Sequence, residues 1–165
     1  MKAKQYILRM VMANLVFFLI GVPAMAGEGC SRDDVVDAVE KAVGILEAHG
    51  AEGLHEVGNI RFCGDNYVFV NDLKGKTLMH AKKTLIGKVL IGLKDDKGKR
   101  FFADFSEVAK SSRQDRNGTS FFNGSGWVEY RWPKPGAKKF SPKLSFIKGC
   151  MMGDDNVYVG AGIYK

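Results

Sequence analysis

The chain contains 165 residues, of which 45% are hydrophobic and 26% are charged, and its formal net charge is +7. This length and composition suit one globular domain with its own core and exclude a disordered or fibrous chain. Lys2, Lys4 and Arg9 supply three of the seven net charges. The other four are spread over scattered lysines, which is typical of a solvated surface and does not indicate nucleic acid.

Residues 1–26 have the pattern of a secretory signal peptide. After the basic start, residues 10–22 form an almost unbroken apolar run, and an Ala-Met-Ala motif then places small residues where signal peptidase requires them. This run is shorter than the ~20 residues that a membrane-spanning helix needs. We therefore expect cleavage before Gly27 and a single periplasmic or secreted domain over residues 27–165. An uncleaved segment that anchors the chain in the inner membrane is the alternative.

The clearest helical pattern in the chain covers residues 31–48. Ser31 can cap the N-terminus, acidic residues follow in the first turn, and valines and a leucine recur at helical spacing. Gly50 is placed to end this helix. A short second helix is expected over residues 51–56.

Two strands and a helix are expected in the middle of the chain. Residues 66–72 are apolar on both faces and predict a buried strand, and residues 77–80 predict its return strand. Residues 85–93 are expected to form an apolar patch over the sheet, and residues 100–109 a helix with phenylalanines on its buried side. Residues 111–125 are polar and rich in glycine and asparagine, which predicts a loop.

A β-hairpin organises the C-terminal half of the chain. Residues 127–132 and 143–148 alternate as two strands, and the Pro-Lys-Pro-Gly sequence at residues 133–136 is a turn that cannot continue either of them. Residues 157–164 predict the last strand. The order of these elements predicts an α+β domain with one antiparallel-rich sheet.

Six segments carry a resemblance to a known family: residues 67–72, 75–80, 85–90, 126–133, 142–148 and 159–164. Taken together and in this order, they resemble a single Cache domain (sCache_2-like), the PAS-like extracellular sensor module of bacterial receptors. The resemblance covers residues 30–164. It implies a five-stranded sheet in the order 2-1-5-4-3, with a long N-terminal helix on one face. It also implies a helical crossover on the other face, a ligand pocket beneath it, and binding without chemistry.

Two features depart from the family pattern. Family members are usually fused through a second transmembrane helix to a kinase or chemotaxis module, whereas this chain stops at Lys165. It therefore resembles a stand-alone periplasmic member, which would act with a separate membrane receptor, kinase or chemotaxis protein. The loop over residues 111–125 is also longer than usual. Its Arg113 and Arg116 are candidates to clamp a carboxylate if the loop folds over the pocket entrance, with solvated loop arginines as the favoured alternative.

Five residues are predicted to line the pocket that the resemblance implies. His80 borders the family's pocket at the end of the second strand, with a purely structural histidine as the alternative. Phe102 would form part of the apolar wall, and the phenol of Tyr130 and the indole of Trp132 would donate hydrogen bonds to a carboxylate. Lys148 would face an anionic ligand, with a snorkelling lysine at a strand end as the alternative.

Two further expectations concern the space around these residues. Strand alternation leaves open which face of residues 126–132 is inside, so Trp127 is the alternative to Tyr130 and Trp132. Gly160 and Gly162 remove side chains from one face of the last strand and are expected to leave room beside it.

The three cysteines leave one thiol unpaired in a compartment that permits disulfides. Neither they nor the three histidines show metal-ligand or redox spacing, so no metal and no cofactor are expected. In the strand order that the resemblance implies, Cys63 and Cys150 precede two central neighbouring strands. If these strands run parallel, the two cysteines meet, so we expect a Cys63–Cys150 disulfide with Cys30 free.

The leading hypothesis is an exported sensor module that binds a small organic anion, such as a short carboxylate, in signal transduction. The alternative is a ligand-free interaction protein that modulates a membrane receptor through its amphipathic helix and Phe121 and Phe122. An enzyme is not expected. The paired aspartates at residues 95–96 and 154–155 lie in glycine turns, where no pocket would raise a carboxyl pKa.

Overall fold

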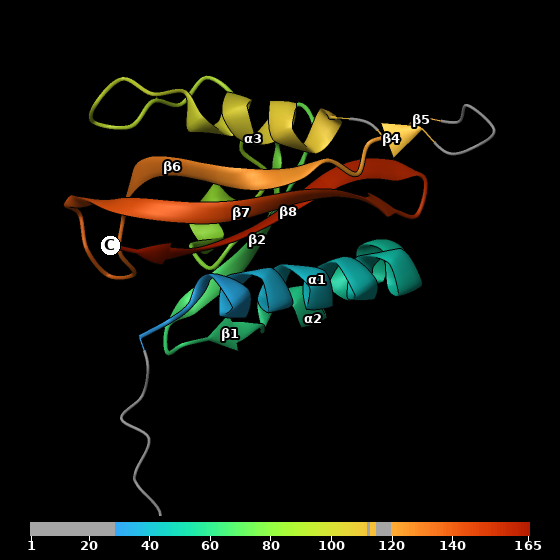
Figure 1. The fold of residues 1–165 in the computed structure, drawn as a ribbon, viewed down its shortest axis with the longest axis horizontal. Helices are drawn as coiled ribbons and strands as arrows, with labels where there is room; N and C mark the ends of the chain where they lie inside the picture. The colour runs from blue at the N-terminus through green and yellow to red at the C-terminus, as the bar shows by residue number, and fades with distance from the viewer. Residues whose placement is uncertain (1–28, 112, 115–119) are drawn as a thin grey trace, which may run out of the picture.

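One antiparallel sheet separates two helical layers in the computed structural model (Figure 1). The structure describes residues 29–111, 113–114 and 120–165, so the expected signal peptide lies outside the described residues. Within these ranges, no helix is long and apolar enough to cross a membrane. The expected α+β class is confirmed.

Six strands form the sheet, and every hydrogen-bonded pair of neighbours is antiparallel. Their order is β1-β2-β8-β7-β6, and β3 pairs with β2 on the same side as β1. If the two-residue β1 is left aside, this is the 2-1-5-4-3 order that the resemblance implied. The strands are β1 (Arg61–Phe62), β2 (Asn66–Asp72), β3 (Thr77–Met79), β6 (Ser125–Pro133), β7 (Phe140–Met152) and β8 (Asp155–Tyr164).

A capping box begins α1 (Arg32–His49) at the predicted residue. The Ser31 hydroxyl accepts the Asp34 N–H at 3.1 Å, and the Asp34 carboxylate accepts the Ser31 N–H at 2.8 Å. These bonds satisfy donors that the first helical turn leaves unpaired. One aliphatic stripe of α1 is buried against the sheet and consists of Val35, Ala38, Val39, Ala42, Val43 and Leu46.

Two expected elements differ in extent from the structure. In place of one helix over residues 51–56, a 3₁₀ turn (Gly50–Gly53) leads into α2 (Leu54–Gly58). The chain passes so close to α1 here that a Cβ on Gly53 would lie 2.8 Å from Cγ2 of Ile45. Within the segment expected as a loop, β4 (Arg113–Gln114) and β5 (Ser120–Phe121) pair as a short ribbon.

The helix α3 (Phe101–Lys110) lies across the opposite face of the sheet (Figure 1). As expected, its phenylalanines point inward. Phe101 stacks on Tyr130 of β6 with ring centroids 4.4 Å apart, and Phe105 packs against Tyr158 of β8 at 6.1 Å. The core on this face is therefore aromatic, whereas the core beneath α1 is aliphatic.

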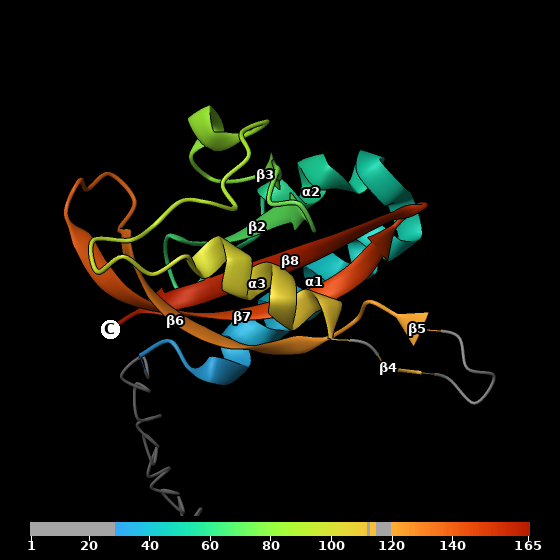
Figure 2. The same cartoon turned by 90° about the horizontal axis from the view of Figure 1, so that it is seen from above.

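The crossover between β3 and α3 projects from the β2–β3 edge of the sheet (Figure 2). Gly87 donates to the Thr77 carbonyl at 2.7 Å, and Leu90 donates to the Gly75 carbonyl at 2.8 Å. These bonds fix which side chains point inward, and Leu90 packs against the aromatic core. The expectation that residues 85–93 form an apolar patch over the sheet is wrong for three side chains. Ile86, Val89 and Leu93 face solvent and are 41%, 64% and 38% exposed.

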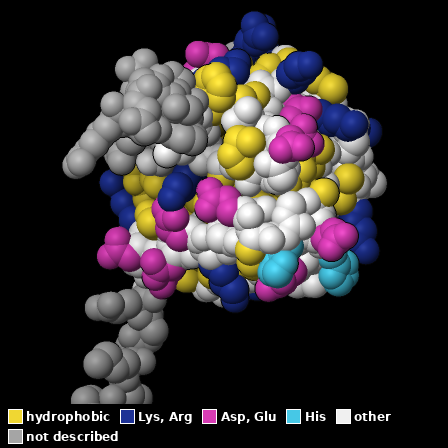
Figure 3. All heavy atoms as spheres, turned by 90° about the vertical axis from the view of Figure 1, so that its right-hand side faces the viewer, with side chains coloured by type: hydrophobic (Ala, Val, Ile, Leu, Met, Phe, Trp, Pro, Cys, Tyr) yellow, Lys and Arg dark blue, Asp and Glu magenta, His cyan; other side chains and the backbone are white. Residues whose placement is uncertain are grey.

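The layer formed by α1 and α2 is acidic. Residues 29–65 contain eight Asp or Glu side chains and three Lys or Arg. Figure 3 looks at the molecule from the right-hand side of Figure 1, and several acidic side chains and the visible histidines lie low on that face, at the level of this layer. The net positive charge of the chain therefore comes from other segments.

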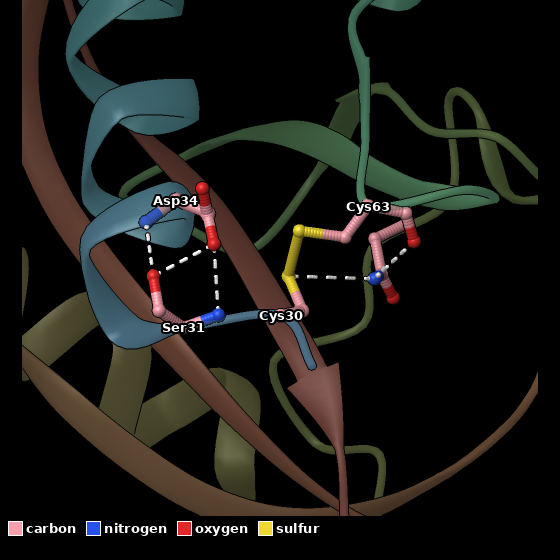
Figure 4. Close-up of a disulfide and its surroundings, with 5 residues drawn as sticks. Cys30, Ser31, Asp34 and Cys63 are labelled. Atoms are coloured by element: carbon pink, nitrogen blue, oxygen red, sulfur yellow. Dashed lines mark hydrogen bonds between the residues drawn. A yellow bond between two sulfur atoms is a disulfide. The ribbon is translucent and has the colours of Figure 1, made fainter. Parts of the chain in front are cut away.

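A disulfide joins Cys30, immediately before α1, to Cys63, in the turn before β2 (Figure 4). Their Cα atoms are 5.5 Å apart, a usual separation for a bridge. The expected Cys63–Cys150 disulfide is wrong, because β2 and β8 run antiparallel and Cys150 lies within β7, where it pairs with Val157. Cys150 is a free, buried thiol in the aliphatic core.

The disulfide and the capping box together fix the start of α1 beside the sheet. Asp34 brings a carboxylate oxygen within 4.8 Å of both sulfur atoms, a grouping of atoms that resembles a metal site. The sulfurs are bonded to each other, however, and the carboxylate accepts both the N–H and the hydroxyl of Ser31 (Figure 4). The group is therefore explained by its structural role.

Candidate ligand-binding site

The aromatic layer beneath α3 contains four of the five residues that were predicted to line a pocket. The space that it encloses measures only about 10 Å³, which is room for about one water molecule. The pocket expected between the sheet and the crossover is therefore almost filled by the protein's own rings. These are Tyr67, Phe69, His80, Phe101, Phe102, Phe105, Tyr130 and Trp132.

The structure decides which rings of β6 point toward α3. Trp132 lies edge-on to Phe101 at 5.6 Å, and Tyr130 belongs to the same aromatic core. Trp127 points the other way and packs against Phe146 at 5.3 Å, next to the aliphatic core. The inward placement of Tyr130 and Trp132 is confirmed, while their role in binding stays a prediction.

A larger cavity, of about 620 Å³, opens beside these rings. Its volume falls within the usual range for small-molecule sites. Tyr67, His80 and Trp132 line both spaces and form the wall between them. The crossover and the β6–β7 hairpin supply the remaining, largely apolar lining: Ala81, Lys82, Leu93, Pro133, Lys134, Pro135, Gly136, Ala137 and Phe140.

A buried lysine next to this wall was missed by the sequence analysis. Lys143 of β7 is 0% exposed, and its Nζ has no hydrogen-bond partner among the described residues. The amine lies 4.2 Å from the ring centroid of Tyr67 and 4.9 Å from that of Tyr164. Burial lowers the pKa of Lys143 to about 7. A neighbouring anion would shift this amine to its charged form.

His80 is a neutral hydrogen-bonding group in the cavity wall. Its Nδ1 accepts the Lys82 N–H at 2.9 Å, so the proton of the neutral ring is on Nε2. Burial lowers the pKa of His80 to about 3, and the charges of Lys143 and Lys82 act in the same direction. The imidazole therefore stays neutral at physiological pH and can donate through Nε2.

Lys148 lies on the opposite face of β7 from Lys143. Its Nζ contacts the Glu40 carboxylate of α1 at 2.5 Å. The prediction that Lys148 faces the ligand is wrong, because side chains alternate along a strand. Phe146 and Lys148 fall on the α1 side, whereas Lys143 and Ile147 fall on the α3 side.

The two glycines of β8 do not leave the expected room. A Cβ on Gly160 would overlap the ring of Phe69, and one on Gly162 would overlap the Ser145 hydroxyl. The neighbouring side chains thus fill the space that the glycines vacate. The Ser145 hydroxyl lies 3.0 Å from the Tyr130 phenol oxygen, which fixes the position of the ring of Tyr130.

The register of the β6–β7 hairpin determines that Lys143 points inward. Tyr130 pairs directly with Lys143 across β6 and β7, and directly paired residues share a face of a sheet. An inward Tyr130 therefore requires an inward Lys143. The arginines expected at the pocket entrance stay untested, because Arg116 and the side chain of Arg113 lie outside the described part of the chain.

The sheet order and the flanking helices are those of a PAS-like domain. The family model for Cache domains named dCache_2 matches residues 47–165. The chain belongs to the Cache domain family.

The similar proteins are sensors. Over 127 residues, 75% of this chain, it is 34% identical to the methyl-accepting chemotaxis protein McpP of Pseudomonas putida, and it spans 21% of that relative's length. A solved periplasmic sensor domain of a chemotaxis protein is 31% identical, with a TM-score of 0.65 over 80% of this chain and 93% of that one. A Cache chemosensory domain studied for carboxylic acid recognition is 27% identical, with a TM-score of 0.66 over 80% and 91%. The first of these relatives is thus a whole chemotaxis protein, and the two solved structures are sensory domains.

Proposed function

We propose that this Cache domain binds a small organic anion, such as a short carboxylate, and that Lys143 is its charged partner. The observation that carries the proposal is an amine that is 0% exposed and has no hydrogen-bond partner among the described residues. Burying a charge without a counter-ion is costly, and an apolar side chain of similar length would fill the same volume without that cost. A bound carboxylate would supply the missing counter-charge.

In this proposal, the ligand enters through the cavity of about 620 Å³ and packs its apolar part against the lining. The Tyr67 ring belongs to the cavity wall and also contacts the Lys143 amine, at 4.2 Å. Binding therefore requires this ring to move, so that an ion pair replaces a cation–π contact. His80 and Trp132 act as neutral donors to the carboxylate, and Phe102 and Tyr130 hold the wall in place.

The relatives support this class of ligand. One solved Cache chemosensory domain with 27% identity is described by its recognition of carboxylic acids. The largely apolar lining of the cavity suits an anion with a short hydrocarbon part, and one buried amine suits a single negative charge.

Thermal-shift measurements with matched small molecules test the proposal. Propionate and acetate should raise the melting temperature, whereas propionamide, which has the shape of propionate but no charge, and propylamine should not. Lys143→Met should lose the response to propionate. A flat response to all carboxylates and amino acids would contradict the proposal and favour the ligand-free modulator of a membrane receptor.

We further propose that residues 1–26 direct export and are cleaved before Gly27, so that the domain works in the periplasm or outside the cell. N-terminal sequencing of the protein recovered from cells tests this, and a retained Met1 would contradict it. The domain would report binding to a separate membrane receptor, kinase or chemotaxis protein. Crosslinking with and without ligand should then recover that partner in a ligand-dependent way, and recovery that ignores the ligand would favour the modulator.

A further inference from the structure

The first part of the crossover also carries an exposed basic surface. Residues 80–94 contain four lysines, Lys82, Lys83, Lys88 and Lys94, and no acidic residue. All four are exposed, and none forms an ion pair with another described residue, although Lys82 also lines the cavity. Four lysines elsewhere do pair with a carboxylate: Lys99, Lys110, Lys148 and Lys165. This part of the crossover is therefore an uncompensated positive surface.

Exposed aliphatic side chains lie among these lysines. Of the five large hydrophobic residues that are exposed in the described part of the chain, three belong to the crossover: Ile86, Val89 and Leu93. Val89 is 64% exposed, the largest of these fractions.

The backbone holds the side chain of Val89 outward. Lys76 and Val89 form a β-bridge, and the Thr77 N–H donates to the Lys88 carbonyl at 2.9 Å. The alternation that turns Leu90 toward the core turns Val89 toward solvent. The exposure of Val89 is therefore a consequence of fixed hydrogen bonds, and a change of its side chain leaves those bonds in place.

We propose that the crossover surface, defined by Lys83, Ile86, Lys88 and Val89, docks on a bilayer that contains anionic phospholipids. Lysines that flank protruding aliphatic side chains match the two layers of such a bilayer, with phosphate at the surface and hydrocarbon just beneath it. Figure 2 shows that this segment projects from the sheet edge, which allows its tips to reach the interface.

The observations favour a membrane over other anionic partners. A nucleic acid or another soluble polyanion would pair with the lysines but would leave Ile86 and Val89 in water. The acidic layer of α1 and α2, with eight acidic and three basic side chains over residues 29–65, would be repelled by the same lipids. The domain would therefore bind through the crossover.

Flotation with lipid vesicles tests the proposal. The wild-type chain should bind vesicles of phosphatidylcholine with roughly a third of phosphatidylglycerol, and high salt should release it. Lys83→Glu with Lys88→Glu should lower the partition coefficient at least about twentyfold, because each lysine near an anionic surface raises this coefficient about fivefold. The matched control is Lys138→Glu with Lys139→Glu, an equal charge change in the exposed hairpin turn, which should have a much smaller effect.

A second pair of variants tests the aliphatic tips. Val89→Ser should lower the partition coefficient about fivefold, because it removes apolar area that enters the bilayer. Met151→Ser is the matched control, since Met151 is also exposed, at 39%, but lies near the end of β7, away from the crossover. All variants carry the same N-terminus as the wild type. Any binding by the apolar N-terminal run is therefore equal in all of them, and it is recognised because it persists on vesicles of pure phosphatidylcholine.

Two results would overturn the proposal. One is equal binding of the wild type and Lys83→Glu with Lys88→Glu to the anionic vesicles. The other is a Val89→Ser variant that binds like the wild type while soluble polyglutamate displaces both, which would identify an acidic polymer as the partner. Neither result bears on the carboxylate site, because these residues lie outside the cavity lining and their variants should keep the thermal shift with propionate.

Discussion

The two faces of the sheet differ in what fills them. Beneath α1 the core is almost wholly aliphatic, with residues such as Val39, Leu46 and Val159 fully buried. Beneath α3 the core is aromatic. The three buried side-chain polar atoms that lack a partner in the described ranges belong to Asn71, Lys143 and Tyr158, on the strand positions that face α3. The α1 face therefore supplies stability, whereas the α3 face tolerates unpaired polar groups, which the proposed ligand would use.

Truncation in the aliphatic face should have the largest effect on stability. Leu46 is 0% exposed, so Leu46→Ala should lower the free energy of unfolding by about 2–5 kcal/mol. Urea unfolding measures this loss. Because the sheet separates Leu46 from the cavity, the folded variant should bind propionate with unchanged affinity. A large loss of affinity in folded protein would break the separation of the two faces.

Removal of the disulfide should have the next largest effect on stability. Cys30→Ser with Cys63→Ser should lower the free energy of unfolding by about 2–4 kcal/mol, because the bridge closes a loop between residues 33 positions apart. Peptide mapping without reduction should join Cys30 to Cys63. Cys150 should react with alkylating reagents only after unfolding, since it is 3% exposed and burial raises the pKa of its thiol to about 12. A mapped bridge that contains Cys150 would contradict this assignment.

On the aromatic face, Lys143→Met should stabilise the protein. It should raise the free energy of unfolding by about 1–4 kcal/mol below pH 7. Burial lowers the pKa of Lys143 from its ordinary 10.5 to about 7, so between these values the unfolded chain holds a proton that the folded chain lacks. Wild-type stability should therefore rise with pH in that window by up to about 1.4 kcal/mol per unit.

Lys143→Met lacks this rise, so its advantage should shrink from pH 7 toward 10.5. Urea titrations on both sides of pH 7 measure the difference between the two proteins. Parallel pH profiles would show that the amine is not buried in the way described.

The pH dependence of binding has the same limiting slope, because a tenfold change in affinity corresponds to about 1.4 kcal/mol. Affinity for propionate should be constant just below pH 7 and should fall by up to about tenfold per pH unit above it, because the Lys143 amine must be protonated to pair with the carboxylate. His80, with a pKa lowered to about 3, does not titrate in this range. Calorimetric titrations at several pH values provide the test, and an affinity that stays constant well above pH 7 would exclude Lys143 as the partner.

Local patterns were sufficient to predict most elements of this fold. The strand expected over residues 66–72 coincides with Asn66–Asp72, and α1 begins at the expected cap. Alternation and capping are properties of a few adjacent residues, so they can be read without the tertiary structure. The strand order within the sheet was available only through the resemblance to the Cache family.

The cation of the candidate site could not be predicted, because it depends on register. Lys143 and Lys148 lie on the same strand, and a difference of one residue in register exchanges the faces on which they lie. The sequence does not determine how many residues of the hairpin are in the turn. The cysteine pairing failed for a related reason, since the strand directions and the position of Cys150 within β7 are tertiary facts.

Calorimetric titration of propionate into three proteins tests the central claim most directly. The proteins are the wild type, Lys143→Met and Lys148→Met, and the last is a matched control because Lys148 lies on the same strand but pairs with Glu40 on the other face. We predict that Lys143→Met binds at least about thirtyfold more weakly than the wild type and that Lys148→Met differs from it by about twofold or less. Retained affinity in Lys143→Met, or an equal loss in both variants, would contradict the claim that the buried amine holds the ligand.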